Sequence, residues 1–457
     1  MGEAGRRVRL FGTDGVRGVA GYELTASLAL DLSVAAATIL AGTGDTRTGG
    51  AAGSPVAVVG RDPRASGEFL EAAVVAGLAS AGVGVLRLGV IPTPGVAYLT
   101  EALGATFGVV ISASHNPAQD NGIKFFGRGG VKLPDTVEDE IEARLGSRPK
   151  VTSFGRVSDA AAEQERYLDH LLSTLPADPG RALAGLRVVA DCAHGAAYRL
   201  APQALRRAGA EVIAIGAEPD GLNINAGVGS TCLDTLAAAV VRHGADAGIA
   251  YDGDADRCLA VDADGQPLDG DQILALLATE LREAGRLAHD AVVVTVMSNQ
   301  GFHVAMRDAG ITVIETPVGD KHVSAAMRDG GYSLGGEQSG HIILIEHATT
   351  GDGILTSLQL LSAVHRRGMP MAAAAAMMRK YPQVLVNVPG DASRLGPLVD
   401  AAVVRAQTQL GGNGRVLVRP SGTEPAIRLM VQAADAGLAE QVIGQLAAEV
   451  RLALVGQ

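Results

Sequence analysis

The order of apolar and polar positions along the 457-residue chain predicts strands that alternate with helices over most of its length. From Pro55 onward, short runs rich in β-branched residues are followed by helical segments, which recurrently close on an Ala-Gly pair. This pattern occurs three times, with strands expected at 56–59, 186–191 and 291–297. Because strand–helix alternation is typical of α/β folds, we predict three related α/β domains with mixed sheets.

The last part of the chain has a different pattern. Strands are expected at 384–388, 415–418 and 427–432, and an amphipathic helix at 438–454. A polar loop, Arg419–Pro425, lies between two of these strands. The pattern predicts a small C-terminal α+β domain.

Each of the three α/β repeats contains a polar loop directly after the strand that follows its second helix. These loops are Ser114–Pro117, Asp252–Arg257 and Gly336–His341. In open α/β sheets, ligands bind beyond the carboxyl ends of the strands. Three loops in equivalent positions are therefore expected to line one shared cleft.

Composition limits what such a cleft can bind. Asp and Glu number 49 and Lys and Arg 38, so the formal charge is −11, which argues against a nucleic acid or an anionic membrane as partner. Three scattered cysteines are too few for a disulfide framework or a Cys-rich metal site. The first residues contain no long apolar run, and polar residues interrupt the later ones. We therefore expect a cytoplasmic protein without a signal peptide or membrane span.

Two residues on expected loops are candidates for a functional role. Ser114 follows the apolar run Val109–Ile111 and precedes an Asn-Pro turn, so it is expected on a loop at a strand end. Such loops often carry catalytic groups, although an ordinary polar strand exit is the alternative. Arg17 stands alone in the Gly-rich stretch 10–18 and suits a phosphate or carboxylate, or else a solvated surface turn.

The loop that begins at Asp252 is the strongest metal candidate. Asp252, Asp254 and Asp256 alternate directly after an expected strand, so their carboxylates can turn toward one point. Oxygen ligands in that arrangement suit a hard divalent cation such as Mg²⁺. Without a cation the three carboxylates would repel one another, and a solvated acidic turn is the alternative.

Three further features suit a phosphorylated sugar. Arg419–Pro425, with Arg428 beyond it, offers hydroxyls, backbone amides and arginines around a glycine. This combination suits a phosphate-binding loop, and a plain hairpin turn is the alternative. Gly336–His341 offers groups that suit sugar hydroxyls, and His341 is either a general acid/base or an ordinary loop histidine. Lys124 could transfer a proton if burial or nearby cations lower its pKa; otherwise it is a solvated surface charge.

Four separate motifs, in this order along the chain, resemble the α-D-phosphohexomutase family. They are Ser-Ala-Ser-His-Asn-Pro, Asp-Gly-Asp-Ala-Asp-Arg, Gly-Glu-Gln-Ser-Gly-His and Arg-Pro-Ser-Gly-Thr-Glu-Pro, and the resemblance covers nearly the whole chain. It implies four domains around one deep cleft. We place a catalytic-loop domain at 1–158 and a metal-loop domain at 159–260. A sugar-loop domain follows at 261–370, and a C-terminal phosphate-binding domain at 371–457.

The resemblance also implies roles for individual residues. Ser114 would be phosphorylated, and one Mg²⁺ would be held by the phosphoserine together with Asp252, Asp254 and Asp256. Catalytic or supporting side chains beside them would be Arg17, His115, Lys124 and Arg257. Groups that hold sugar hydroxyls would be Glu337 and Ser339. Groups that hold the non-reacting phosphate would be Arg419, Ser421, Gly422, Thr423 and Arg428.

Within the family, Phe11–Gly18 and Asn121–Phe126 are most similar to the corresponding stretches of members that act on amino sugars. This implies interconversion of glucosamine 6-phosphate and glucosamine 1-phosphate through a phosphoserine and a sugar bisphosphate. A sugar 1,6-bisphosphate would be the activator, and the active form would be a monomer or a homodimer. The product would be used to make UDP-N-acetylglucosamine, and hence the cell wall. The alternatives are a mutase of glucose or mannose phosphates, a metal-dependent sugar-phosphate phosphatase, and a catalytically silent sugar-phosphate-binding protein.

Overall fold

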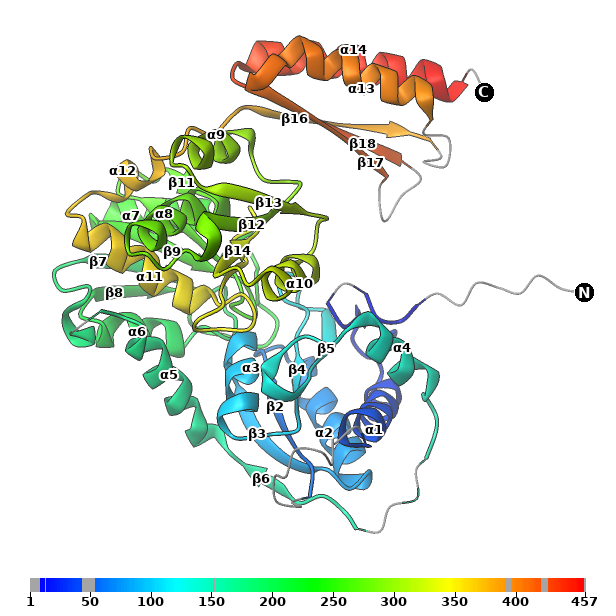
Figure 1. Cartoon of the computed structure of the whole chain (residues 1–457). Coiled ribbons are helices and arrows are strands. Elements are labelled where there is room, and N and C mark those ends of the chain that lie inside the picture. The colour runs from blue at the N-terminus through cyan, green and yellow to red at the C-terminus, as the bar shows by residue number, and fades with distance from the viewer. Residues whose placement is uncertain are drawn as a thin grey trace, which may run out of the picture. The chain divides into compact units, whose positions relative to one another are not determined.

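The structure, a computed structural model, describes residues 9–12, 14–42, 54–148, 150, 153–176, 178–390, 396–420 and 426–455 (Figure 1). The chain forms two compact units. One comprises Met1–Val296 with Ile314–Ala375, and the other Met297–Val313 with Ala376–Gln457. Most of the Gly/Thr/Ala-rich stretch 41–54 lies outside the described residues.

The first sheet has six strands in the order β1-β5-β4-β2-β3-β6. They are β1 (Val16–Val19), β2 (Val56–Arg61), β3 (Gly84–Val90), β4 (Phe107–Ile111), β5 (Asp120–Phe126) and β6 (Val157–Asp159). Its helices are α1 (Ala26–Gly42), α2 (Ser66–Ser80), α3 (Thr93–Ala102) and α4 (Asp135–Ala143). β2, β3, β4 and β6 run parallel, and β5 and β1 are antiparallel additions beside β4. Every residue of β4 is buried, which explains the uninterrupted apolar run before Ser114.

The second sheet has the order β11-β10-β9-β7-β8 and is also mixed. Its strands are β7 (Arg187–Asp191), β8 (Glu211–Ile215), β9 (Ala247–Tyr251), β10 (Cys258–Asp262) and β11 (Pro267–Leu268). Its helices are α5 (Gln164–Ser173), α6 (Leu200–Arg207) and α7 (Asp234–His243). The parallel strand β9 returns as the antiparallel strand β10, and the loop between them carries the three aspartates.

The third sheet has the order β13-β12-β14-β15, with β14 parallel to β12 and antiparallel to β15. Its strands are β12 (Ala291–Thr295), β13 (Thr312–Thr316), β14 (Leu334–Gly336) and β15 (Ile342–Leu344). The helices of this part of the first unit are α8 (Gly270–Glu283), α10 (Asp320–Gly330), α11 (Gly353–Arg366) and α12 (Met371–Ala375), whereas α9 (Gln300–Asp308) belongs to the second unit. Helix α8 begins with a capping box in which Asp269 and Gln272 exchange side-chain and backbone hydrogen bonds, so it starts at a fixed residue under the Gly336–His341 loop.

The fourth sheet belongs to the second unit and is antiparallel throughout, in the order β16-β18-β17. Its strands are β16 (Gln383–Pro389), β17 (Gly414–Pro420) and β18 (Ala426–Ala433). Helices α13 (Pro397–Leu410) and α14 (Ala436–Val455) lie side by side over one face of it and bury the core of this part of the chain (Figure 1).

These sheets confirm the prediction of three α/β repeats with mixed sheets followed by an α+β part. The domain limits and the single shared cleft stay predictions. Within the described residues, no helix has both the length and the apolar character that crossing a membrane requires.

Candidate active site

Ser114 lies at a sharp turn of the chain after β4. Its φ is +52°, a left-handed conformation that costs a non-glycine residue about 1 kcal/mol or more, so neighbouring groups must hold it. Ser112 is one of them, because its Oγ accepts the Ser114 N–H at 3.0 Å. In this conformation Ser114 Oγ donates to Asp252 Oδ2 at 2.6 Å and lies 3.2 Å from Nδ1 of His115. Ser114 is only 1% exposed, so the contact with Asp252 is made away from water.

The backbone carbonyls of this loop converge on the fully buried guanidinium of Arg64. It donates to the carbonyl oxygens of Ser114, Asn116, Pro117 and Asp120. Its Nε donates to Asp62 Oδ2 at 2.9 Å, which balances the buried charge. Asn225 contributes from the segment after β8, where its Nδ2 donates to the Ser114 carbonyl at 2.9 Å. Arg64, Asp62 and Asn225 thus fix the loop that presents Ser114, and no local sequence motif described above includes any of the three.

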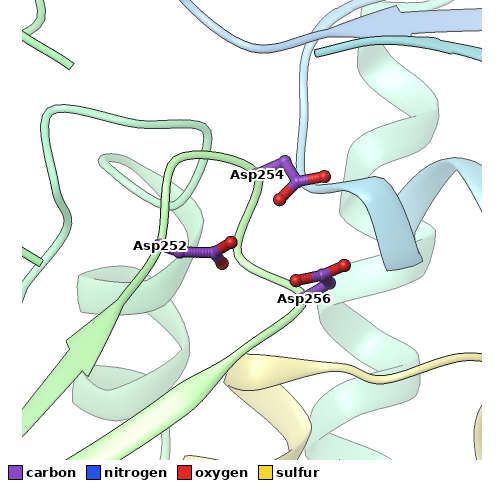
Figure 2. Close-up of side chains that lie close together, drawn as sticks. All are labelled: Asp252, Asp254 and Asp256. Atoms are coloured by element: carbon purple, nitrogen blue, oxygen red, sulfur yellow. The ribbon is translucent and has the colours of Figure 1, made fainter. Parts of the chain in front are cut away.

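The loop between β9 and β10 turns three carboxylates toward one another (Figure 2). Asp252, Asp254 and Asp256 are all buried, and each offers an oxygen within 4.8 Å of those of the other two. The Oδ1 atoms of Asp254 and Asp256 are buried and have no hydrogen-bond partner in the described part of the chain. Gly253 lets this loop approach Ser114, because a Cβ at that position would lie 2.4 Å from the Ser114 carbonyl oxygen.

Burial and mutual repulsion make these carboxylates difficult to ionise together. Burial raises the pKa of Asp252 well above its ordinary value, and the charges of Asp256 and Asp254 raise it further. Burial, together with the Asp254 charge, also raises the pKa of Asp256. Asp254 differs, because Lys124 Nζ at 2.8 Å and the Thr93 hydroxyl at 2.7 Å lower its pKa in spite of its burial. Buried, unpartnered carboxylate oxygens in one place are a donor set that fits a divalent cation.

Lys124 is buried in a set of ion pairs centred on Asp14. Oδ2 of Asp14 lies 2.6 Å from Lys124 Nζ and also accepts from Arg17, while Oδ1 lies 3.1 Å from Lys132 Nζ. Lys132 also pairs with Asp320 at the start of α10. Burial alone would lower the pKa of Lys124, but Asp14 and Asp254 raise it above its ordinary value. The lowered pKa that we considered for Lys124 is therefore wrong for this state, since its neighbours are anions.

His115 is held neutral beside Ser114. Burial and then the charges of Arg257 and Arg17 lower the pKa of His115 to about 4. The same two arginines each keep one buried Nε–H without a hydrogen-bond acceptor among the described residues. Guanidinium donors without an acceptor, close enough to His115 to lower its pKa, are suited to bind an anion in this region.

The Gly336–His341 loop joins the same region through His341. The His341 backbone bridges that of Arg257, and its Nε2 accepts the Gly351 N–H at 3.2 Å, 3.9 Å from Asp256 Oδ2. Elsewhere in the loop, Glu337 Oε1 accepts the Gly319 N–H at 3.1 Å. The buried Ser339 Oγ has no hydrogen-bond partner within the described residues. The structure thus brings His341 to the aspartate loop and leaves Ser339 free to bind a hydroxyl.

The C-terminal candidates lie in the second unit. Arg419 and Arg428 face each other in register across β17 and β18, and both are partly exposed. The predicted phosphate-binding residues Ser421, Gly422 and Thr423 lie outside the described residues.

A buried serine beside a carboxylate triad, carried on α/β sheets, is an arrangement suited to phosphoryl transfer. Four family models match in chain order: Phosphoglucomutase/phosphomannomutase alpha/beta/alpha domains I, II and III at residues 8–151, 165–265 and 269–381, and the C-terminal domain at 372–449. The chain belongs to the phosphoglucomutase/phosphomannomutase family, a family of phosphohexomutases. The resemblance inferred from the four motifs is confirmed.

Relatives and solved structures agree with this assignment. The chain is 61% identical to a phosphoglucosamine mutase of Thermobifida fusca (97% of this chain, 98% of the relative) and 59% identical to one of Streptomyces griseus (98% and 99%). A phosphoglucomutase/phosphomannomutase family protein of Burkholderia thailandensis has the same fold, with a TM-score of 0.81 at 24% identity over 97% of both chains. The N-acetylphosphoglucosamine mutase of Aspergillus fumigatus, solved with GlcNAc-6P and magnesium, has a TM-score of 0.66 at 18% identity (97% and 96%).

Proposed function

We propose that this chain catalyses the phosphoglucosamine mutase reaction, which interconverts glucosamine 6-phosphate and glucosamine 1-phosphate. The observation that carries the proposal is the 2.6 Å hydrogen bond from Ser114 Oγ to Asp252, inside a buried triad with unpartnered oxygens. Relatives about 60% identical over nearly their whole length bear that name, which favours the amino sugar over glucose or mannose phosphates. The reaction would supply UDP-N-acetylglucosamine for the cell wall, in the cytoplasm.

We infer that Ser114 is phosphorylated in the active enzyme. A free serine hydroxyl is a weak nucleophile, whereas a phosphoserine is a phosphoryl donor. The unused Nε–H donors of Arg17 and Arg257 would bind its phosphate oxygens, and the neutral His115 would donate its one ring N–H beside them. One Mg²⁺ would be held by Asp252, Asp254 and Asp256 with the phosphoserine, and when bound it neutralises charge on the transferring group.

The reaction would proceed in two transfers. In the first, the bond from Ser114 Oγ to phosphorus breaks, a bond forms to the free hydroxyl oxygen of the sugar monophosphate, and that hydroxyl's proton ends on Ser114 Oγ. The product is a sugar bisphosphate. The bisphosphate turns around, and in the second transfer its other phosphate passes to Ser114 Oγ. The bond from phosphorus to the sugar oxygen breaks, and the Ser114 proton ends on that sugar oxygen. Lys124, with its raised pKa, keeps its ammonium protons and offsets the charge of the moving group, and His341 is the candidate proton carrier.

Turning the intermediate around requires binding groups that accept either end of the sugar. Glu337 and Ser339 would bind the ring hydroxyls in both orientations, because a carboxylate and a hydroxyl accept or donate at several positions. Arg419 and Arg428, with Ser421, Gly422 and Thr423, would bind whichever phosphate is not reacting. An added sugar 1,6-bisphosphate would act as activator by phosphorylating Ser114.

A paired isomerisation assay tests the proposal. Glucosamine 6-phosphate and glucose 6-phosphate are offered separately to the native chain and to Ser114→Ala, with Mg²⁺ and a trace of sugar 1,6-bisphosphate. We expect preference for the amino sugar and loss of turnover in the variant. Preference for glucose would overturn the substrate, and release of inorganic phosphate at the rate of isomerisation would indicate a phosphatase. Full activity of Ser114→Ala would overturn the phosphoserine mechanism.

A further inference from the structure

Lys132 holds together carboxylates that come from distant parts of the chain. It follows β5 in the sequence, and its Nζ lies 3.1 Å from Asp14 Oδ1 and pairs with Asp320. Asp320 is the first residue of α10, close to the loop that carries Glu337. All three charged side chains are largely buried, with 10% to 17% of each exposed, so little water screens their attraction.

The same Asp14 carboxylate also holds Lys124, the lysine beside the aspartate triad. Its other oxygen lies 2.6 Å from Lys124 Nζ, which in turn lies 2.8 Å from Asp254 Oδ2. A carboxylate group is rigid and planar, so a displacement at one oxygen moves the other. The contacts therefore form one continuous chain of ion pairs from Asp320 through Lys132, Asp14 and Lys124 to Asp254.

The Asp320 end of this chain is tied to the loop expected to bind the sugar. The residue before it, Gly319, donates its backbone N–H to Glu337 Oε1 at 3.1 Å. His341, at the other end of that loop, has its Nε2 3.7 Å from Asp320 Oδ2. A bound sugar that displaced Glu337 or His341 would therefore also displace Asp320.

We propose that Lys132 is a positioning residue, which transmits the placement of α10 and the Glu337 loop to Lys124 through the shared carboxylate of Asp14. The inference rests on the proposed function, because that function gives Lys124 its task. Without Lys132, Asp14 and Asp320 would face each other as buried carboxylates with one fewer cation between them. Asp14 would then turn toward Lys124 and Arg17. The position of Lys124 would no longer depend on the position of the loop that carries Glu337.

A second contact between the same parts of the chain provides a matched control. Thr349 Oγ1, in the loop before α11, donates at 2.6 Å to the carbonyl of Gly130, two residues before Lys132. This hydrogen bond is neutral, and it includes no member of the ion-pair chain. Thr349→Val therefore removes a contact between these parts of the chain and leaves the chain of charges intact.

The test compares Lys132→Met, Lys132→Arg and Thr349→Val with the native chain. We expect Lys132→Met to lower kcat about tenfold or more while KM changes less than about threefold, because alignment for transfer is lost rather than substrate binding. Lys132→Arg should recover most of kcat, and Thr349→Val should retain it within about twofold. In an Asp320→Asn background, adding Lys132→Met should lower kcat little further, as expected for residues that act as one unit. A kcat that falls equally in Lys132→Met and Thr349→Val, or that tracks the folded fraction alone, would overturn the proposal.

The positional claim can also be tested without any activity. Crystal structures of the native chain and Lys132→Met would show whether Lys124 Nζ leaves its native place between Asp14 and Asp254. An unchanged Lys124 would overturn the inference even in an active mutase. A displaced Lys124 in a chain that proved to have another activity would support it and overturn only the proposed function.

Discussion

The guanidinium of Arg64 donates a 2.9 Å hydrogen bond to the backbone carbonyl of Ser114. Arg64 is wholly buried, and its only carboxylate partner is the equally buried Asp62 among the residues that the structure describes. A planar fork of donors is suited to gather several carbonyls at fixed angles, which an ammonium cannot do. The strained φ of Ser114 is therefore maintained by a side chain that touches no reacting atom.

Arg64→Lys tests this support. The lysine keeps the charge for Asp62 but cannot reach all four loop carbonyls, so the loop should relax. We expect kcat to fall about tenfold or more, with a loss of about 1–3 kcal/mol in the free energy of unfolding for the unpaired carbonyls. Arg61→Lys is the matched control, since Arg61 pairs with Glu71 instead of the Ser114 loop. Equal kcat in the two variants would show that the loop holds its shape without Arg64.

The sequence predicted those parts of the site whose members are neighbours along the chain. Ser114 with His115, and the three aspartates at alternate positions, could be recognised because each motif is a local pattern of residue types. Arg64 could not be recognised in this way, because its contact with the Ser114 carbonyl joins residues 50 positions apart.

The other supporting residues of the site lie even farther from their partners along the sequence, so no local motif includes both members of a pair. Asn225 reaches Ser114 across 111 positions, and Lys132 reaches Asp320 across 188. Asp14 was visible in the motif around Arg17, but its task as the shared partner of two lysines depends on the folding of β5 against β1. For the fold, the spacing of the apolar positions was sufficient to predict the repeats. Each strand and helix buries one of its own faces, so the apolar pattern of that element is local in the sequence.

Removal of one charge from the aspartate triad should separate stability from metal binding. Among the described residues, the ion-pair partners of Asp256 are distant, with Arg257 Nε and His341 Nε2 each 3.9 Å from one of its oxygens. We expect Asp256→Asn to raise the metal-free free energy of unfolding by about 1–2 kcal/mol, because like charges repel at close range. It should also abolish the rise in melting temperature that we expect Mg²⁺ to give the native chain. Thermal unfolding with Mg²⁺ and with a chelator measures both effects.

The exposed Asp264, on the turn after β10, supplies the control for this comparison. Asp264→Asn removes the same formal charge outside the triad, so the Mg²⁺ response should stay native. A native Mg²⁺ response in Asp256→Asn would remove this carboxylate from the ligand set.

Gly253 is a position where one methyl group should be decisive. A Cβ there would lie 2.4 Å from the Ser114 carbonyl oxygen and 2.9 Å from Asn225 Nδ2, so one of the two loops must move. We expect Gly253→Ala to lower kcat about tenfold or more and to destabilise the chain by about 1–3 kcal/mol, as overpacking does. Gly444→Ala, in open space on α14, should leave kcat unchanged and gain about 0.5–1 kcal/mol. Native kcat in Gly253→Ala would contradict the close approach of the two loops.

Asp352 gives a pH-dependent prediction for a carboxylate outside the triad. It caps α11 by accepting the Leu355 N–H at 2.9 Å, and the Tyr167 hydroxyl donates to it at 2.8 Å. Burial raises its pKa to about 6, in spite of these hydrogen bonds. A pKa raised in the folded state means that the folded chain holds this proton more tightly than the unfolded chain. The stabilising contribution is therefore complete below the unfolded pKa near 4 and is lost as the pH rises through 6.

Asp352→Asn measures this contribution, because asparagine remains a good helix cap and carries no charge at any pH. At pH 8 the variant should be more stable than the native chain by about 1–3 kcal/mol, since burying the ionised carboxylate no longer costs free energy. As the pH falls from 7 toward 4, the native Asp352 takes up its proton and the melting temperatures of the two chains should converge. Melting temperatures recorded in steps between pH 4 and 8 provide the comparison. A difference that stayed constant over this range would show that Asp352 does not titrate there, and that the asparagine acts through packing alone.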